Sequence, residues 1–427
     1  MARPDDVRFE SDEEFAHRLD ADDPLGAYRG EFLFPRRADG EPVTYLAGNS
    51  LGLQPRSARA AVEQELDAWA DRAVDAHFEG DHPWFAYHEN FRESGARLVG
   101  AKPGEVVMMN SLTVNLHLMM VSFYRPAKHR YKIVIDYPHF PSDVYAVKSQ
   151  LRFHGIDPSD GLIVVRPRDG EHTLRIEDIE TMLATEGEHI ALVLLSAVNF
   201  FTGQLFDLPR ITAAAQCAGC IVGFDLAHAV GNVPLQLHDW NIDFAVWCSY
   251  KYLNCGPGAP GGCFVHGRHG QDEHLTRFAG WWGNDPESRF LMHLQPEFIP
   301  RTGADGWQLS NPPILAMAPL RASLTLFDEI GMDALRGKSK LLTGYLHFLI
   351  ESAGAETIEI ITPDDPSQRG AQLSFVVHDR ARERFAALLD RGVVCDFRQP
   401  DVIRAAPAPL YNSFHDVWTF AKVLTQT

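Results

Sequence analysis

The stretch Phe244-Ala-Val-Trp-Cys-Ser-Tyr-Lys-Tyr-Leu253 places one lysine, Lys251, at the end of an apolar run that is typical of a buried strand. Lys251 is also the only lysine between Lys148 and Lys338. A lysine at the end of such a strand has lost much of its water, which disfavours the ammonium form and leaves a nucleophilic amine. The stretch therefore indicates either a lysine that forms a Schiff base or a lysine whose chain extends along apolar surface to solvent.

Strand-like and helix-like segments alternate on both sides of this stretch, from residue 105 to about residue 270. The expected strands are short apolar runs at 132–136, 163–166, 190–196, 220–225, 245–249 and 263–266. The expected helices between them cover 115–124, 142–153, 176–185 and 208–219. This alternation predicts an α/β fold with a mainly parallel sheet that is covered on both faces. Ligands of such sheets bind beyond the carboxyl ends of the strands, where four polar residues fall: Ser196, Asp225, His228 and Lys251.

The predicted organisation is an N-terminal arm (1–44), a large domain (45–310) and a small C-terminal domain (311–427). The arm is acidic and interrupted by prolines, and we expect it to pack against the small domain. A helix is predicted from Ser57 onward because apolar residues recur there with a 3.6-residue period: Val62, Leu66, Trp69, Ala70 and Ala73. After residue 313, a long helix over 315–330 and a β-α-β-like piece over 372–396 predict that the small domain is α+β.

The composition is that of an ordinary globular chain of 427 residues, 45% hydrophobic and 22% charged. A net charge of -18 disfavours nucleic acid or an anionic membrane as a partner. The run 190–201 is too short to span a bilayer and the N-terminal residues lack the apolar stretch of a signal peptide, so we expect a cytoplasmic protein. Six cysteines give no disulfide framework, and Cys217-Ala-Gly-Cys220 has no second pair of ligands nearby, so no metal is expected.

Asp225 and Lys251 form a pair that pyridoxal phosphate (PLP) requires. A lysine binds this cofactor covalently, and an aspartate keeps the pyridine nitrogen protonated, which makes the ring an electron sink. The sequence also brings His228 close to the same strand end. Structural readings stay open for two of these residues, since Asp225 also suits a helix cap and His228 a buried structural histidine.

A phosphate site is predicted at Ser111-Leu-Thr-Val-Asn115, which precedes an amphipathic helix. Helix N-termini offer free N–H groups and a positive dipole to anions, although Thr113 also suits a simple N-cap. Ser196 and Tyr250 are candidates for further phosphate donors. A Walker loop and a dinucleotide glycine fingerprint are both absent, which disfavours the competing phosphate-binding folds.

Together these segments resemble kynureninase, a PLP-dependent enzyme with the aspartate-aminotransferase fold, PLP-dependent transferase fold type I. The resemblance extends over nearly the whole chain, from residue 46 to residue 416. It rests on motifs at 46–52, 110–117, 140–143, 201–204, 223–232, 237–240, 247–254, 310–313 and 410–416. Cysteine desulfurases and class V aminotransferases share only the general plan of these motifs.

The resemblance implies that Lys251 carries the cofactor, that Asp225 pairs with its ring nitrogen and that Tyr250 is a candidate proton relay. Phe140 is expected to cover a face of the ring. The other expected cofactor contacts are Leu112, Thr113, Pro141, Ser142, Asp143, Ser196, His228, Trp281 and Asn311. Trp281 and Asn311 are expected to come from a second subunit, so the resemblance implies a homodimer with shared sites.

The reaction that the resemblance implies is hydrolysis of the Cβ–Cγ bond of L-kynurenine or L-3-hydroxykynurenine, which yields L-alanine and anthranilate or 3-hydroxyanthranilate. Its products feed tryptophan catabolism, NAD biosynthesis or a specialised pathway. The expected substrate contacts are His77, Ser310, Asn311 and Arg404, the last of which binds the substrate carboxylate. His77 and Ser310-Asn311 match the branch of the family that prefers 3-hydroxykynurenine, whereas the other branch has tryptophan and Gly-Thr there.

Two alternatives stay open at this point. One is a class V aminotransferase or cysteine desulfurase on the same fold, although a desulfurase needs a mobile C-terminal cysteine and Cys395 lies in an apolar run. The other is a non-catalytic binding protein built on the fold, which the presence of both Lys251 and Asp225 disfavours.

Overall fold

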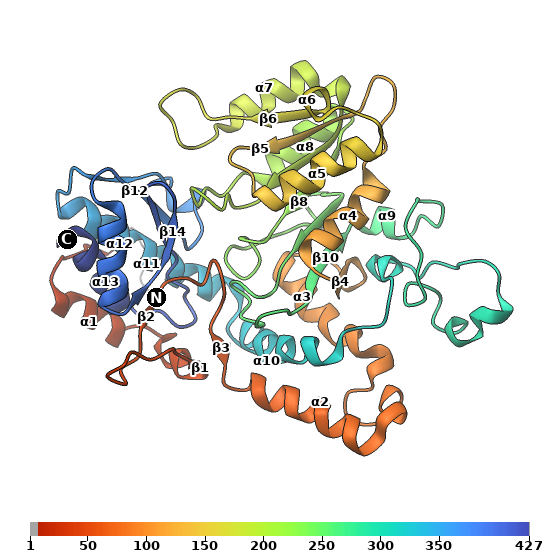
Figure 1. Ribbon diagram of the computed structural model, residues 1–427, viewed down its shortest axis with the longest axis horizontal. Helices are drawn as coiled ribbons and strands as arrows, with labels where there is room; N and C mark the ends of the chain where they lie inside the picture. Colours follow the sequence, from red (N-terminus) through yellow and green to blue (C-terminus); the bar gives the residue numbers. More distant parts are fainter. Residues whose placement is uncertain (1–6, 427) are drawn as a thin grey trace.

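Within residues 7–426, which the computed structural model describes, a seven-stranded sheet forms the centre of the molecule (Figure 1). In spatial order its strands are β4 (Val106–Met109), β10 (Gly261–Val265), β9 (Phe244–Trp247), β8 (Ile221–Asp225), β7 (Ile190–Ser196), β5 (Lys132–Asp136) and β6 (Leu162–Val165). Only β10 is antiparallel to its neighbours. The prediction of a mainly parallel sheet is therefore confirmed.

Helices cover both faces of this sheet, because the interiors of the central strands are apolar and successive residues point to opposite faces. On one face, Leu192 and Leu194 of β7 join a hydrophobic cluster with α4 (Leu112–Phe123) and α5 (Pro141–Phe153). On the other face, Val193 and Leu195 join a cluster with α7 (Ile176–Glu186), α8 (Leu208–Cys217) and α3 (Arg92–Val99). Each predicted strand and helix of this region is present, with ends that differ by at most three residues.

A second, four-stranded antiparallel sheet lies in the C-terminal part, in the order β11 (Ile358–Ile360), β12 (Leu373–Val377), β15 (Val402–Ala405) and β14 (Asp396–Arg398). It shares a hydrophobic cluster with helices α1 (Glu13–Ala21), α11 (Met332–Ser352), α12 (Ala381–Asp390) and α13 (Phe414–Gln426). Two small pairings complete the sheets: β1 (Phe32–Leu33) with β3 (Gln54–Pro55), and β2 (Thr44–Tyr45) with β13 (Val393–Val394).

Short helical segments connect these elements. Two are single α-helical turns, α6 (Pro158–Gly161) and α9 (Gly267–Gly270). The others are 3-10 helices: η2 (Gly26–Glu31), η3 (Ala73–His77), η4 (Trp84–Phe91), η5 (Pro103–Glu105), η6 (Gly187–His189), η7 (Arg289–Leu294), η8 (Ala304–Trp307) and η9 (Pro366–Gln368).

The described part of the N-terminal arm packs against the C-terminal part, while its first six residues lie outside the described residues. Helix α1 contacts α13. Lys338 on α11 forms a buried ion pair with Asp23, with 2.7 Å between Nζ and Oδ2. Asp20 accepts hydrogen bonds from the backbone N–H groups of Phe414 and His415, which begin α13. Buried charges of this kind need their partners, so the arm is fixed to this part of the chain.

Helix α10 (Ile314–Ile330) packs on the large part of the molecule rather than on the small one. It contacts α2 (Ala58–Arg72) and α3, and its Met317, Leu320 and Leu324 belong to the cluster on the large sheet. The two hydrophobic clusters therefore separate within α11 and not at residue 311, where the change in sequence character places the boundary. Asn311-Pro-Pro marks a turn into α10, which the sequence alone does not distinguish from a domain boundary.

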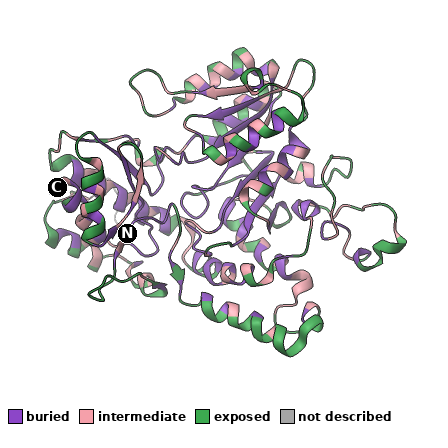
Figure 2. Ribbon diagram, viewed as in Figure 1, coloured by how far each residue is buried: buried purple, intermediate pink, exposed green. Residues whose placement is uncertain are grey.

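The predicted helix after Ser57 is α2, but its apolar stripe faces outward. The buried residues of α2 are Ala58, Ala61 and Glu65, whereas Leu66 is 42% and Trp69 58% exposed. Figure 2 shows α2 largely exposed along the edge of the molecule. Apolar residues that recur every 3.6 positions predict the helix, but they do not show which part of the molecule, if any, covers the apolar stripe.

Candidate active site at the carboxyl edge of the large sheet

The parallel strands deliver polar residues to one edge of the sheet. Asp136 ends β5, Ser196 ends β7 and Asp225 ends β8, and the register places Ser196 directly beside Asp225. Lys251 lies four residues after β9, the next strand in the sheet. The arrangement follows from strand direction, since carboxyl ends of parallel strands meet at the same edge.

The amine of Lys251 is held by an imidazole. Its Nζ lies 2.9 Å from Nε2 of His228 and 5.7 Å from the centre of the Phe140 ring. Burial, together with the positive charges of Lys251 and Arg404, keeps the pKa of His228 well below its usual value. His228 is therefore neutral and accepts the hydrogen bond from Nζ. The other ring nitrogen of His228, Nδ1, is buried without a hydrogen-bond partner.

Asp225 lies in a buried pair with Asp143 from the first turn of α5. Oδ1 of Asp225 accepts a hydrogen bond of 2.8 Å from the backbone N–H of Ala227. Neither carboxyl oxygen of Asp143 has a hydrogen-bond partner. Burial and the nearby charge of Asp225 raise the pKa of Asp143 to about 8, so Asp143 tends to hold a proton at neutral pH.

Two further residues of the site were missed by the sequence reading, Asp136 and His139. Nδ1 of His139 lies 2.6 Å from Oδ1 of Asp136, and its Nε2 lies 3.7 Å from Oδ2 of Asp143. Both side chains are completely buried. Asp136 ends the predicted strand 132–136, as Asp225 ends its own strand. The expectation that polar residues at the carboxyl ends of strands form the site therefore applies to Asp136 as well.

Four of the predicted cofactor contacts meet at two helix N-termini. Leu112 and Thr113 begin α4, Pro141 and Ser142 begin α5, and Oγ of Ser142 lies 3.2 Å from Oγ1 of Thr113. A Cβ atom at Gly261 would lie 3.2 Å from the backbone nitrogen of Leu112, so glycine keeps this approach open. Two hydroxyl groups and two positive helix ends suit an anion.

The other two candidate phosphate donors have partners of their own. The hydroxyl and the backbone N–H of Ser196 both donate to Oδ1 of Asp136, at 3.2 and 2.9 Å. Tyr250 is half-buried, and burial together with the neighbouring Cys248 raises the pKa of its phenol. Phosphate contacts of Ser196 and Tyr250 stay predictions.

Arg404, the predicted carboxylate-binding residue, is a buried residue of β15. Its Nε and Nη2 lie 2.7 and 2.6 Å from Oδ2 of Asp396, and its Nη1 donates to the carbonyl of Phe200. Burial lowers the pKa of the guanidinium, and Asp396 opposes that shift. The guanidinium lies within 5.8 Å of the Phe200 ring, which in turn contacts Phe140.

Three of the predicted substrate contacts, His77, Ser310 and Asn311, lie together but away from Lys251, and we call them the aryl-pocket residues. His77 and Asn311 line one cavity of about 480 Å³, together with Trp69 and Trp84. The His77 ring stands edge-on to Trp84 at 5.4 Å, and Oγ of Ser310 donates to Oδ1 of Asn311. Lys251 does not line this cavity. Trp281 packs instead against Trp282 and Phe290.

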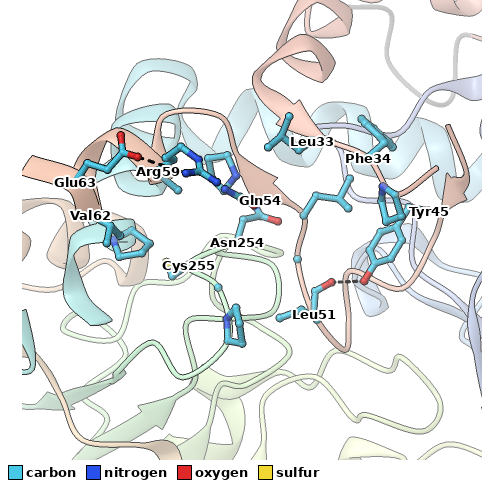
Figure 3. A pocket seen from close by; sticks show the side chains of 18 of the residues that line it. Leu33, Phe34, Tyr45, Leu51, Gln54, Arg59, Val62, Glu63, Asn254 and Cys255 are labelled. Atoms are coloured by element: carbon cyan, nitrogen blue, oxygen red, sulfur yellow. Dashed lines mark hydrogen bonds and ion pairs between the residues drawn. The ribbon is translucent and has the colours of Figure 1, made fainter. Parts of the chain in front are cut away.

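A larger apolar cavity of about 750 Å³ opens beside α2 (Figure 3). Leu33, Phe34 and Leu51 line one side, and Val62 on α2 lines the other. Asn254 and Cys255, just after Lys251, form part of its floor. The hydroxyl of Tyr45 donates to the carbonyl of Leu51 at its rim, at 2.7 Å.

The residues at the sheet edge fit PLP on structural grounds. The site offers a lysine amine, a buried carboxylate pair and a hydroxyl-lined pair of helix N-termini. Buried polar atoms without partners remain on Asp143 and His228, which is expected where a polar ligand completes a site.

Comparisons with known proteins agree with this assignment. The family described as kynureninase C-terminal domain matches residues 335–424. The chain is 58% identical to a kynureninase of Myxococcus xanthus over 97% of each chain. It is 54% identical to one of Koribacter versatilis, over 97% of each chain. Among solved structures, the cysteine desulfurase CsdA of Escherichia coli superposes with a TM-score of 0.74 at 18% identity, covering 94% of this chain and 98% of the other.

Fold and site together define a PLP-dependent enzyme of fold type I, the class that includes that desulfurase fold. Within the class, the chain belongs to the kynureninase family and is a PLP-dependent hydrolase of a small-molecule substrate. Among residues 7–426, no helix is both long and apolar enough to cross a membrane.

Proposed function

We propose that this enzyme hydrolyses the Cβ–Cγ bond of L-3-hydroxykynurenine in preference to that of L-kynurenine. The observation that carries the preference is the cavity shared by His77 and Asn311. Its indole walls, Trp69 and Trp84, suit an aryl ring, and the imidazole and amide offer hydrogen bonds to a ring hydroxyl. A site built to bond a hydroxyl penalises the substrate that lacks it.

In this proposal Lys251 holds the cofactor and later moves the substrate proton. The neutral His228 accepts from Nζ and so directs the lone pair of a deprotonated amine. Phe140 lies close enough to Nζ to cover one face of a bound ring. When bound, PLP supplies an electron-poor ring that takes up the charge developing on the substrate.

Asp225 and Asp143 hold the proton of the ring nitrogen, and Leu112, Thr113 and Ser142 hold the phosphate. Tyr250 stays protonated at neutral pH because its pKa is raised, so it acts as a proton donor in the relay rather than as a resting base. The support for these roles is the burial and the contacts of each group.

Arg404 binds the substrate carboxylate in this proposal. The planar guanidinium presents a fork of donors that fits a carboxylate, and Asp396 already holds it by two of its nitrogens. Asp396 therefore orients Arg404, and the substrate carboxylate shares or displaces that contact.

We also propose that the enzyme is a homodimer with shared sites and that it works in the cytoplasm. The dimer is supported by the separation of His77 and Asn311 from Lys251, which a second chain can bring together. The exposed stripe of α2 and the neighbouring apolar cavity supply a surface for it. All six cysteines are free thiols, which suits a reducing compartment.

The desulfurase alternative gains no support from the site. Cys395, the residue that would have to move, is buried next to β14, and burial raises the pKa of its thiol. A catalytic thiolate needs exposure and a lowered pKa.

Side-by-side kinetics test the substrate preference. With the PLP-loaded enzyme, kcat/KM for L-3-hydroxykynurenine is expected to exceed that for L-kynurenine by about tenfold or more, the scale of one hydrogen bond to the ring hydroxyl. An equal or higher kcat/KM for L-kynurenine would show that His77 and Asn311 do not bind the 3-hydroxyl group in a way that favours the hydroxylated substrate.

A further inference from the structure

A chain of buried ionisable groups continues from the cofactor site into the interior. It runs from Asp225 through Asp143 and His139 to Asp136. The imidazole of His139 lies between two acids, 2.6 Å from Asp136 on one side and 3.7 Å from Asp143 on the other. Nε2 of His139 and both oxygens of Asp143 have no hydrogen-bond partner.

Asp136 is firmly anchored as a carboxylate. Its Oδ1 accepts from the backbone and hydroxyl of Ser196, its Oδ2 accepts from Nδ2 of Asn199 at 2.9 Å, and His139 supplies the remaining donor. Burial alone would raise its pKa, but the attraction to His139 and these hydrogen bonds lower it. The anion therefore fixes the ring of His139 from one side.

His139 is a cation in this setting. Burial opposes its charge, but the attraction to Asp136, Asp143 and Asp225 outweighs burial and raises its pKa to about 9. These acids come from β5, α5 and β8, and the residue that faces His139 from β7 is the neutral Ser196, 3.4 Å away. The nearby Lys251 also acts on Asp143, in the direction that lowers its pKa.

We propose that His139 is a positioning residue for the cofactor: its imidazolium, held by Asp136, places a fixed positive charge beside the Asp143–Asp225 pair and thereby helps that pair to keep the pyridine nitrogen protonated. Two adjacent buried carboxyl groups repel each other's charge, and each is drawn toward its neutral form. A fixed cation beside them offsets that repulsion. The inference rests on the proposed PLP site, and it adds a residue that touches neither cofactor nor substrate.

The test is made on the PLP-loaded enzyme without substrate. His139→Asn keeps an N–H donor for Asp136 but removes the cation. With ¹⁵N-labelled PLP, the chemical shift of the ring nitrogen is expected to move toward its unprotonated value, and cofactor release is expected to become about tenfold faster, as for the loss of one charge partner. His189→Asn, a change at a histidine whose side chain is 41% exposed, serves as the matched control and should leave both readouts unchanged.

The double variant Asp136→Asn with His139→Asn separates positioning from simple neutralisation. If His139 only neutralised Asp136, removal of both charges would restore the wild-type ring-nitrogen shift and release rate, and the proposal would be overturned. The proposal expects the double variant to stay defective because Asp143 and Asp225 still lack their cation. A His139→Asn enzyme with a wild-type shift would overturn it as well.

A measurement on the unaltered enzyme covers the case in which the variants do not fold. In the ¹⁵N spectrum of the histidine rings, His139 should carry protons on both nitrogens at neutral pH, and a neutral ring there contradicts the proposal. None of these readouts uses a substrate, so a wrong substrate preference leaves them unchanged. A failure to bind PLP would instead overturn the proposed function itself.

Discussion

Lys251 depends on neighbours from three different elements for its reactivity. His228, three residues after β8, accepts from its amine, Phe140 at the start of α5 lies over it, and Asp225 and Asp143 supply negative charge nearby. Besides burial, Arg404 and Arg398 add positive charge that lowers the pKa of His228, and Asp396 pairs with both arginines. The proposed site thus combines the amine of Lys251 with a neutral imidazole and a nearby pair of acids.

Replacement of the lysine tests the covalent role. Lys251→Ala is expected to remove the visible absorbance of the bound cofactor and to lower turnover by more than about 1000-fold, because covalent attachment and proton transfer are both lost. Absorbance spectra and steady-state assays measure the two effects. Lys128→Ala, at an exposed lysine, is the control and should behave as wild type; a Lys251→Ala enzyme that keeps the absorbance would contradict the assignment.

The aryl-pocket histidine has its own test. His77→Phe keeps an aromatic ring beside Trp84 but removes the N–H groups. We expect kcat/KM for 3-hydroxykynurenine to fall about tenfold or more and that for kynurenine to change little, since only the hydroxylated substrate loses a hydrogen bond. Equal losses on both substrates would indicate that His77 serves only to stack.

Local patterns predict those site residues whose chemistry shows in the sequence. Lys251, Asp225 and Thr113 follow from strand-end and helix-start rules, and the structure brings the first two to one edge. Asp136 was within reach of the same rules. His139 and the burial of Arg404 were not, because both depend on which distant acids pack around the side chain.

At the scale of elements, the positions of strands and helices along the chain are well predicted, whereas the faces by which the helices pack are not. Strand β7 matches its predicted range because its apolar run is buried on both faces. The apolar stripe of α2 faces outward, and α10 packs on the large sheet. Both depend on tertiary contacts, which the 3.6-residue recurrence of apolar residues does not reveal. For that reason, the division of the two hydrophobic clusters within α11 could not be predicted from the sequence.

The 3-10 helix η4 contains a buried histidine that predicts an acid sensitivity. Burial, with the positive charges of Arg301, Arg92 and Arg289, lowers the pKa of His88 from 6.5 to about 2. Between those values the unfolded chain binds a proton that the folded chain does not. Because the folded pKa is depressed, stability from this group is complete above pH 6.5 and is lost as the pH falls below it.

His88→Leu removes this dependence and leaves no unpaired buried nitrogen. The quantity to compare is the free energy of unfolding of the variant minus that of wild type. One pH unit below the unfolded histidine pKa, this difference should be about 1.4 kcal/mol more favourable to the variant than it is one unit above that pKa. Urea unfolding at the two pH values measures the change. A difference between the two proteins that does not vary with pH would show that His88 titrates normally in the fold.

At the scale of the whole molecule, the proposed cofactor residues and the proposed aryl-ring contacts lie in two separate places. The sheet edge holds Lys251 and the cofactor residues, and the cavity beside α2 and α10 holds His77 and Asn311. In the proposed two-fold dimer, the sheet edge of each chain would meet the cavity of its partner, so the same contact would occur twice. The sequence suggested this arrangement only through resemblance, because no pattern within one chain records a partner.

The exposed stripe on α2 tests the dimer. Leu66→Glu places a charge on the apolar surface, and we expect sedimentation to show a shift from dimer to monomer, with activity falling in parallel. Arg72→Glu, at the exposed end of the same helix, changes charge without touching the stripe and should leave the dimer intact. A wild-type enzyme that sediments as a monomer and is fully active would contradict the proposed assembly.

The most direct test of the account mixes two inactive enzymes. One carries Lys251→Ala, and the other carries Trp281→Ala with Asn311→Ala, so each dimer lacks one half of both sites. After subunit exchange, mixed dimers contain one intact site, and hydrolysis of 3-hydroxykynurenine should return to about a quarter of the wild-type level with random pairing. Mixed dimers that form but stay inactive would contradict a site shared between Lys251 of one chain and Asn311 of the partner subunit.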